Sequence, residues 1–188
     1  MKKMMNVVFL ASTLAMSAHA ADSYTIDPFH TYPVFKVNHF GFSNQIGRFN
    51  KSSGNITLDY AAKSGNVELV IDTTSIDMGF PLWDEHMSAE KFFNVAKFPT
   101  ITFKSSKLTF KDGKVVGGEG QITIKGVSKP LSVTVSDFNC AVNPINKKPT
   151  CGANVSAKLK RSDFGMKEYL PAVGDDVEIV YAIEATKN

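Results

Sequence analysis

The sequence predicts an all-β fold of antiparallel strands with a short helical insert. Apolar and polar residues alternate with period two over most of the chain, which gives each predicted strand one apolar and one polar face. Clusters of Gly, Pro, Asn and Asp separate the alternating runs. Only one stretch, at about residues 84–96, changes to helical spacing. One dry face and one wet face per strand is the pattern of antiparallel sheets.

The first 20 residues precede this domain and are predicted to be a cleaved signal peptide. Two lysines near the start are followed by an apolar stretch, residues 7–16, that is too short to span a bilayer. An Ala-His-Ala cleavage site ends at Ala20. We therefore expect a periplasmic or secreted protein that begins at Ala21 and has no stable membrane anchor.

Residues 21–188 are long enough for one domain with its own core. Loss of the two leading lysines lowers the net charge from +3 to +1, because 19 of the 21 basic residues then face 18 acidic ones. A nearly neutral surface has no electrostatic footprint for nucleic acid. Nucleic acid is therefore not an expected partner.

The first predicted strand lies within Asp27–Phe49. Phe35, Val37 and His39 fall on one face of it, and the intervening polar residues fall on the other. Pro33 lacks a backbone N–H, so it indicates a strand start or an edge strand.

Six further runs show the same alternation. The residues on their apolar faces are, in chain order, Val67, Leu69 and Ile71; Ile101 and Phe103; Ile122 and Ile124; Leu131, Val133 and Val135; Ala153, Val155, Ala157 and Leu159; and Val177, Ile179, Tyr181 and Ile183. The turn signals are Ser64-Gly65-Asn66, Asp112-Gly113, Gly117-Gly118, Gly126 with Pro130, and Gly174-Asp175. Each run is predicted to turn its apolar face toward the core.

The helical insert is predicted at about residues 84–96, where Phe92, Phe93 and Ala96 fall at three-to-four spacing. Asp84 and Ser88 are candidate caps, so one helix and two short helical pieces both fit the pattern. A proline shortly after the insert ends it.

Cys140 and Cys151 are the only cysteines, and ten residues separate them. An exported chain with two cysteines usually joins them. Pro144, Pro149 and the neighbouring asparagines indicate a surface loop or a long hairpin turn. There is no Cys-x-x-Cys motif, which argues against redox activity. We predict a local disulfide that stabilises the fold by about 3 kcal/mol.

Alternation does not distinguish a sandwich with a solid core from a barrel with a cavity, because both need an apolar inner face. Small residues on inner faces, namely Ala153, Ala157 and Gly120, would leave some volume free and weakly favour the barrel. The alternating pattern fits both architectures.

No catalytic constellation emerges from the sequence, and it has no nucleophile elbow, P-loop or dinucleotide fingerprint. His30, His39 and His86 lie in different predicted elements without metal-ligand spacing, so no metal site is predicted. Asp163 stands in a turn motif and is expected to accept hydrogen bonds from turn amides. We expect no enzyme activity and no cofactor.

Four segments, taken in order, resemble the YceI-like family of periplasmic polyisoprenoid-binding proteins. In the first segment the matching residues are Asp27, His30, Phe35, Val37, His39, Gly41, Ser43, Gly47 and Phe49. In the second they are His86, Phe92, Phe93, Phe98, Pro99 and Phe103. Residues 122–133 resemble the family's central hairpin, and residues 160–181 resemble its closing pair of strands.

The resemblance covers nearly all of residues 23–185, with three departures. Thr31 stands where serine is usual, and Trp83 stands where arginine is usual. The third departure is Pro33 in the first segment. The resemblance implies an extended, eight-stranded, antiparallel, lipocalin-like barrel with a long apolar pore, spanning residues 21–188.

The resemblance also implies a ligand, a polyisoprenoid lipid, with an isoprenoid quinone as one candidate. The residues expected to line its site are Phe35, Val37, His39, Leu69, Ile71, Phe92, Phe93, Phe103, Ile122, Ile124, Val133, Val155, Ile179 and Tyr181. Arg161, His39 and Tyr169 are candidate donors to a head group at the pore mouth.

Residues 79–98 are predicted to cover one end of the barrel, as a gate for ligand entry or as a plug that stabilises that end. A homodimer is expected from the resemblance alone. The alternative function is an exported interaction or stress-response module in which the cavity is incidental and partners dock outside.

Overall fold

The computed structural model describes residues 21–188, and the predicted signal peptide, residues 1–20, lies outside this described part. Its strands are β1 (Asp22–Ile26), β2 (Tyr32–His39), β3 (Ser43–Phe49), β4 (Ser52–Asp59), β5 (Ser64–Asp72), β6 (Ile76–Asp77), β7 (Thr100–Lys111), β8 (Lys114–Ile124), β9 (Val127–Val142), β10 (Pro149–Lys160) and β11 (Val173–Lys187). The helical elements are α1 (Pro81–Ser88) and two 3-10 turns, Thr73–Ser75 and Arg161–Phe164.

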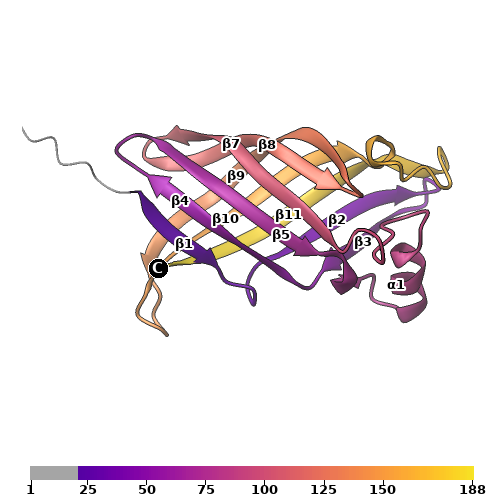
Figure 1. The fold of residues 1–188 in the computed structure, drawn as a ribbon, viewed down its shortest axis with the longest axis horizontal. Helices are drawn as coiled ribbons and strands as arrows, with labels where there is room; N and C mark the ends of the chain where they lie inside the picture. The colour runs from indigo at the N-terminus through magenta and orange to yellow at the C-terminus, as the bar shows by residue number, and fades with distance from the viewer. Residues whose placement is uncertain (1–20) are drawn as a thin grey trace, which may run out of the picture.

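The strands close into a barrel. Eight of them are hydrogen-bonded in the order β1-β4-β5-β7-β8-β9-β10-β11, and β11 pairs back onto β1. Closure occurs around Tyr24, which lies opposite Ile56 of β4 and Lys187 of β11. Every pairing is antiparallel, so the chain runs up and down around the barrel axis (Figure 1). The predicted eight-stranded barrel is confirmed, and the sandwich alternative is wrong.

Three barrel strands are each broken into two pieces. The pieces β1 and β2 both pair with β11. Next to them, β4 pairs with β1, and β3 pairs with β2. Further along, β5 pairs with β4, and β6 pairs with β3. The breaks fall at residues 27–31, 50–51 and 73–75. The strands β2, β3 and β6 therefore extend the barrel wall beyond the closed ring of eight strands.

Buried hydroxyl groups bridge these breaks. Thr31, which is 0% exposed, donates to the Glu184 carbonyl at 3.1 Å and accepts from the Glu184 amide at 2.9 Å. Ser52 Oγ donates to the Thr31 carbonyl at 2.5 Å, and Thr73 Oγ1 donates to the Phe98 carbonyl at 2.7 Å. Threonine keeps the hydroxyl of the serine usual at position 31, so this departure from the family preserves the bonds.

The barrel wall has a gap at one end, between β6 and β7. Among residues 21–188, β6 pairs only with β3, and the pairing of β7 with β5 begins where Thr100 lies opposite Asp72. The intervening segment, residues 78–99, contains α1 and lies across this end of the barrel (Figure 1). We call this end the mouth.

The helix starts earlier and is shorter than predicted. α1 begins at Pro81 and ends at Ser88, whereas Phe92 and Phe93 lie in the turns that follow. Proline suits the first helical position because its missing N–H has no intrahelical partner there. The two phenylalanines have the spacing of a helix, but a turn places their side chains on the cavity wall.

The predicted caps are also wrong, because both residues lie inside α1. The Asp84 carboxylate accepts a hydrogen bond from the Met78 amide at 2.6 Å, so it binds the chain that enters the helix. Ser88 Oγ donates to the Asp84 carbonyl at 2.7 Å. The N-cap position itself is Phe80, which has no side-chain acceptor.

Two predicted turns are confirmed, and the other signals belong to strands. The chain reverses at Asp112-Gly113 and at Gly126. Gly118 lies inside β8, where an added Cβ would come within 3.1 Å of the Lys107 carbonyl. The remaining signals, which also lie in strands, are Gly65, Asn66, Gly117, Pro130, Gly174 and Asp175. Glycine at position 118 thus permits close strand packing instead of a chain reversal.

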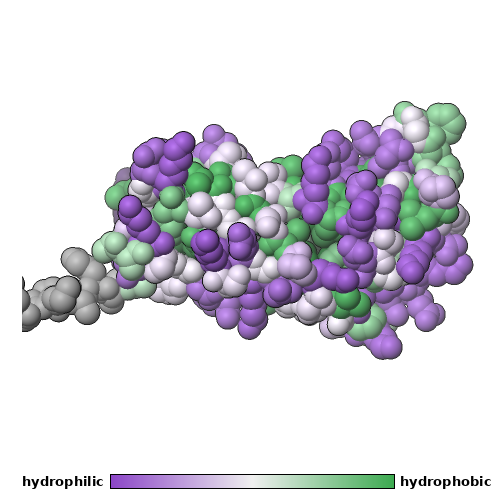
Figure 2. Space-filling view, turned by 90° about the horizontal axis from the view of Figure 1, so that it is seen from above, coloured by the Kyte–Doolittle hydropathy of each residue, from purple (hydrophilic) through white to green (hydrophobic). Residues whose placement is uncertain are grey.

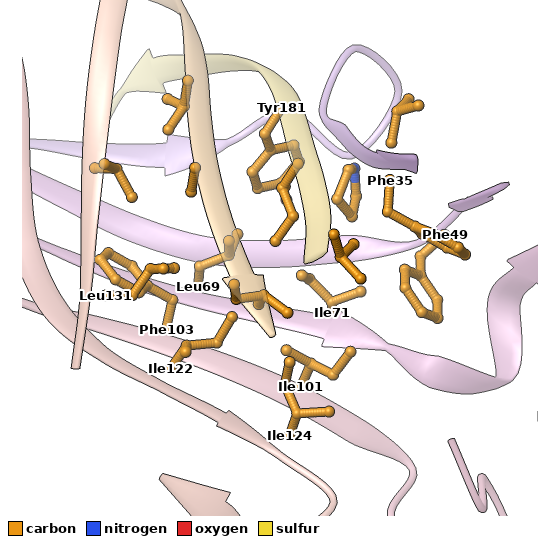
Figure 3. A pocket seen from close by; sticks show the side chains of 18 of the residues that line it. Phe35, Phe49, Leu69, Ile71, Ile101, Phe103, Ile122, Ile124, Leu131 and Tyr181 are labelled. Atoms are coloured by element: carbon orange, nitrogen blue, oxygen red, sulfur yellow. The ribbon is translucent and has the colours of Figure 1, made fainter. Parts of the chain in front are cut away.

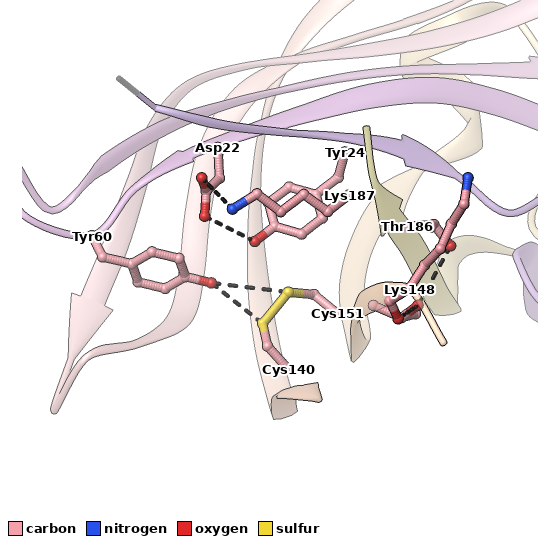
Figure 4. The surroundings of a disulfide bond; sticks show 9 residues. Asp22, Tyr24, Tyr60, Cys140, Lys148, Cys151, Thr186 and Lys187 are labelled. Atoms are coloured by element: carbon pink, nitrogen blue, oxygen red, sulfur yellow. Dashed lines mark hydrogen bonds and ion pairs between the residues drawn. A yellow bond between two sulfur atoms is a disulfide. The ribbon is translucent and has the colours of Figure 1, made fainter. Parts of the chain in front are cut away.

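The end opposite the mouth carries a cross-strand disulfide. Cys140 of β9 and Cys151 of β10 are directly opposite in the strand register and are bonded to each other (Figure 4). The Tyr60 hydroxyl lies 3.3 Å from Cys140 Sγ. The predicted disulfide is confirmed, although its cysteines belong to paired strands and the loop lies beyond them.

Several exposed apolar side chains gather around the mouth, at the right-hand end of Figure 2. They come from four places: the β2–β3 turn, the residue before α1, α1 itself and the loop after Phe164. In that order, the residues are Phe40 and Phe42; Phe80; Leu82 and Trp83; and Tyr169. No helix in residues 21–188 is long and apolar enough to cross a bilayer.

Candidate functional site

The barrel interior contains a cavity of about 370 Å³. Ligand pockets in proteins occupy roughly 300–1,000 Å³, so this volume suits an organic ligand. All eight strands of the closed barrel contribute to its wall, and Figure 3 shows their side chains converging on it. The apolar core of the protein and the wall of the cavity are therefore largely the same residues.

Every residue predicted to line a pore lies on this wall. They are Phe35, Val37, His39, Leu69, Ile71, Phe92, Phe93, Phe103, Ile122, Ile124, Val133, Val155, Ile179 and Tyr181. Inward placement follows from period-two alternation, because each strand turns its apolar face to the barrel axis. Contact between these residues and a ligand stays a prediction.

Several wall residues were not predicted from the sequence. They lie in β1, β3 and β4, in α1 and in loops. They include Tyr24, Phe49, Ile56, Leu58, Met78, Met87 and Met166. Ile56 and Leu58 do alternate, so that signal was present in the sequence. The methionines were not marked by strand alternation, because Met78 and Met166 lie in irregular segments and Met87 lies in α1.

The cavity wall is apolar, and Arg161 is its only charged residue among residues 21–188. Other polar side chains on the wall near the mouth are His39, Gln45, His86 and Tyr169. No carboxylate of the described chain lies on the wall, so the cavity offers no acid–base pair of carboxylic acids. Such a surface suits an uncharged, mostly apolar ligand.

Arg161 lies on the cavity wall, but its guanidinium is bonded to the protein backbone. Its side chain is 6% exposed. Its guanidinium donates to the carbonyls of Gly174, Met166, Glu168 and Val173 at 2.8–3.0 Å. Burial lowers the pKa of Arg161, and the nearby charge of Asp175 acts in the opposite direction. With four of its five N–H groups bonded, Arg161 is poorly suited to the predicted role of head-group donor.

The role predicted for Asp163 belongs to Asp175. Asp163 is exposed, whereas the Asp175 carboxylate accepts from the Ser162 amide at 2.9 Å and from the Ser162 hydroxyl at 2.8 Å. Asp175 lies 13 residues away in β11 and reaches the turn because the two segments are adjacent in the barrel. Local sequence could not distinguish the two acids.

The mouth is covered by a buried turn and an exposed helix. The Phe93 ring centroid lies 6.0 Å from that of Phe35 and 5.1 Å from that of Phe49. The Phe92 ring lies 4.6 Å from the His86 ring. By contrast, α1 has no buried residue. The segment predicted as gate or plug is therefore anchored by two phenylalanines.

The loop after Phe164 borders the mouth from the other side. Tyr169 lies on it and stacks near His86, with ring centroids 6.3 Å apart. Lys91 Nζ lies 3.0 Å from Glu168 Oε1. These contacts connect the segment that contains α1 to the loop.

A polar cluster lies on the seam of the barrel, at the break between β1 and β2. Asp27, His30 and Glu184 each present one possible ligand atom, and these atoms lie within 4.8 Å of one another. His30 Nδ1 is 2.7 Å from Asp27 Oδ2. This group differs from the three-histidine set considered from the sequence, because His39 and His86 lie at the mouth.

Hydrogen bonding shifts the pKa values of this pair. The pKa of His30 is raised, first by its hydrogen bond with Asp27 and then by the charges of Asp27 and Glu184. Burial acts to raise the pKa of Asp27, but hydrogen bonds from His30 and from the Phe29 amide lower it overall. The geometry is that of an exposed ion pair within the break between β1 and β2.

Comparisons with known sequences identify close relatives over the whole chain. The family model described as YceI-like domain matches residues 24–185. A UPF0312 protein of Pseudomonas aeruginosa (strain LESB58) is 33% identical over 192 residues, which cover 100% of this chain and 99% of that protein. Protein YceI of Escherichia coli O157:H7 is 28% identical over 189 residues, covering 99% and 98% of the two chains.

Solved structures show the same fold. The YCEI protein of Campylobacter jejuni has a TM-score of 0.69 at 28% identity, over 81% of this chain and 91% of that one. BcnA of Burkholderia cenocepacia has a TM-score of 0.73 at 24% identity, over 86% and 99%. A polyisoprenoid binding domain from Saccharophagus degradans has a TM-score of 0.62 at 15% identity, over 88% and 98%.

Proposed function

The chain belongs to the YceI-like domain family, and from this membership we propose that it is a carrier that holds one polyisoprenoid lipid in the barrel cavity. The observation that carries the proposal is a cavity wall with a single charged residue, whose N–H groups are mostly bonded within the protein. The domain from Saccharophagus degradans, described as polyisoprenoid-binding, supports this class of lipid. An isoprenoid quinone is the member of the class that we propose.

The energetics of such a ligand point to exchange with a membrane. A tail of about 40 carbons would gain on the order of 30 kcal/mol on leaving water, at about 0.8 kcal/mol per methylene. Measured affinities saturate near about −18 to −21 kcal/mol, so water is not the relevant reference state. A wall of Val, Ile, Leu and Phe side chains is about as apolar as lipid. Transfer between membrane and pore is then nearly neutral, which allows reversible loading.

We also propose that the protein is exported, because its first 20 residues have the composition and cleavage site of a signal peptide. The exposed apolar residues around the mouth would face a membrane surface during transfer. A disulfide suits an oxidising compartment. Export to the periplasm would place the carrier between two membranes.

We propose binding and not catalysis, because no carboxylate of residues 21–188 lies on the cavity wall. The two wall histidines, His39 and His86, have no carboxylate partner in the described hydrogen bonds or ion pairs. His39 and His86 therefore lack the carboxylate that orients the imidazole of a catalytic triad.

Native mass spectrometry of the protein, purified without detergent from the bacterial periplasm, tests the proposal. We expect close to one isoprenoid lipid per protein chain. The experiment compares two arginine variants of neighbouring residues in β10. Val155→Arg places a charge in the cavity, while Ser156→Arg places the same side chain on the outer face.

We expect Val155→Arg to lose the lipid, because an unpaired guanidinium costs several kcal/mol to bury and also occupies the pore. Ser156→Arg should retain wild-type lipid content. Circular dichroism of both variants establishes that they are folded. A folded Val155→Arg protein that still carries lipid would contradict the proposal. A wild-type protein without lipid would favour the interaction or stress-response module instead.

A further inference from the structure

The Tyr181 hydroxyl is the only buried side-chain N or O atom of residues 21–188 that has no hydrogen-bond partner. Tyr181 is 4% exposed and lies on the cavity wall, and Figure 3 shows it among the apolar side chains of the pore. Buried hydroxyls are nearly always hydrogen-bonded, so an orphaned one calls for an explanation.

The Tyr181 hydroxyl makes no hydrogen bond with the protein groups around it. Its register neighbours across the sheet are Val155 and Pro33, neither of which has a polar side chain. Burial raises the pKa of Tyr181, and the nearby Ser52 hydroxyl acts to lower it. Ser52 Oγ donates to the Thr31 carbonyl, and no hydrogen bond joins it to the Tyr181 hydroxyl. A phenylalanine would pack against the same neighbours without the cost of an unsatisfied hydroxyl. A ligand in the cavity that accepts a hydrogen bond would satisfy the Tyr181 hydroxyl.

We propose that Tyr181 donates a hydrogen bond to an uncharged oxygen acceptor of the lipid inside the pore, such as a quinone carbonyl. This inference rests on the proposed function and assigns the residue that binds the head group. The ligand is then an isoprenoid whose neutral head group enters the barrel with its tail. Tyr181 becomes the residue that selects such a lipid over a plain hydrocarbon.

The charges of the wall favour a neutral head group over a diphosphate. Arg161 is the only cation on the wall, and four backbone carbonyls occupy most of its donors. Burial of a charged head group without a paired cation is strongly unfavourable. Burial also raises the pKa of Tyr181, so its phenol stays protonated and remains a donor.

Competition between two lipids tests this inference. Delipidated protein is incubated with phosphatidylcholine vesicles that contain equal amounts of ubiquinone and squalene, a head-free isoprenoid. The protein is separated from the vesicles, and mass spectrometry of its extract measures the ratio of quinone to squalene. Because both proteins meet the same vesicles, comparing this ratio between wild type and Tyr181→Phe cancels the partition of each lipid into the bilayer.

We expect Tyr181→Phe to lower the ratio about threefold to tenfold, which corresponds to one neutral hydrogen bond. We also expect the delipidated variant to be at least as stable as the wild type toward urea. Tyr24→Phe is the matched control, since Tyr24 is equally buried on the wall but its hydroxyl has a protein partner in Asp22 (Figure 4). It should lower the stability of the free protein and change the uptake of both lipids together.

Two results overturn the inference while leaving the proposed function intact. One is uptake of both lipids with the same ratio in wild type and Tyr181→Phe. The other is a delipidated Tyr181→Phe protein that is less stable than wild type, which would show that the hydroxyl is satisfied within the protein. Failure of the wild type to take up either lipid overturns the proposed function together with the inference.

Discussion

At the scale of single residues, Arg161 connects the loop at the mouth to the barrel by its hydrogen bonds to four backbone carbonyls. Lysine at this position keeps the charge but loses the planar array of donors. We expect Arg161→Lys to lower the free energy of unfolding by about 2–4 kcal/mol, because buried carbonyls lose their partners. Urea denaturation measures the change.

The neighbouring Lys160→Ala variant is the control for this experiment. Its ion pair with Asp176 is exposed, so its loss should change stability very little. Equal stability of Arg161→Lys and Lys160→Ala would show that the Arg161 hydrogen bonds do not hold the loop.

The pair of His30 and Asp27 predicts a specific dependence of stability on pH. A histidine whose pKa is raised in the folded state stabilises the protein below its unfolded value of 6.5, and this contribution is lost as pH rises through the folded value. The lowered pKa of Asp27 stabilises above its unfolded value of 3.8, and this contribution is lost as pH falls through the folded value. The pair should therefore contribute most between those two unfolded values.

An NMR titration of the imidazole measures this pair directly. We expect the pKa of His30 to lie above 6.5 in the wild type and to move back toward 6.5 in Asp27→Asn. A His30 titration that is the same in both proteins would exclude the ion pair in solution.

Sequence predicted well those residues whose position depends on local periodicity. Val155 and Ile179 could be assigned to the inner face because each strand alternates independently of its partners. Asp175 and the hydrogen bonds of Arg161 could not be predicted, since their partners come from segments that only the closed barrel brings together. The orphaned hydroxyl of Tyr181 is likewise a property of its neighbours in space.

At the scale of elements, the disulfide joins β9 to β10 at the end opposite the mouth. We expect replacement of both Cys140 and Cys151 by serine to lower the free energy of unfolding by about 2–3 kcal/mol, as expected for a short closed loop. Lipid content should persist, because most of the cavity wall lies in other strands. Urea denaturation and lipid extraction measure the two properties.

Free-thiol titration provides the control for the disulfide. The oxidatively folded wild type should show no reactive thiol. Two reactive thiols per chain, or complete loss of lipid in the double serine variant, would be inconsistent with a purely stabilising role.

The segment 78–99 is predicted to open when lipid enters. Trp83 is the chain's only tryptophan and lies on the cavity wall, so its fluorescence reports on this segment. We expect its emission to change when ubiquinone is added to delipidated protein. We also expect slower loading when cysteines at positions 91 and 168, which replace the Lys91–Glu168 ion pair, are joined by a short bismaleimide crosslinker.

The same double-cysteine protein without the crosslinker is the control for this experiment. Slow loading in both forms would trace the effect to the substitutions. Unchanged Trp83 emission together with unchanged loading in the crosslinked form would identify the segment as a plug that only stabilises the mouth.

The sequence located this insert but misplaced its helix by several residues. Phe92 and Phe93 have helical spacing with Ala96, yet they lie in turns because their rings pack into the mouth. The true start was marked by Pro81, a residue that suits the first turn of a helix. Apolar spacing outweighed that signal in the prediction.

At the scale of the whole molecule, the predicted export has a measurable consequence. We expect the intact mass of protein from the periplasm to correspond to a chain that begins at Ala21. Replacement of Ala18 and Ala20 by bulky residues should block cleavage and retain the precursor, since the cleavage site requires small residues. A mature protein that still contains residues 1–20 would contradict the signal-peptide assignment.

The closure of the barrel could not be deduced from alternation alone. A sandwich and a barrel require the same apolar faces, and only the pairing of β1 with β11 distinguishes them. The breaks in three strands were also invisible, because Thr31, Ser52 and Thr73 are ordinary strand-compatible residues. Resemblance to a family supplied the architecture that local physics left open.

The gap between β6 and β7 allows the opening of the mouth and the stability of the barrel to depend on different contacts. Within residues 21–188 no strand pairing joins these two strands, so widening the mouth breaks none of the sheet that holds the cylinder together. We expect the rate of lipid exchange to depend on aromatic packing around Phe92 and Phe93, whereas resistance to unfolding depends mainly on the paired strands. Substitutions at the exposed residues of α1 should therefore adapt exchange to a thicker membrane, a bulkier lipid or a colder habitat while the strand pairing stays intact.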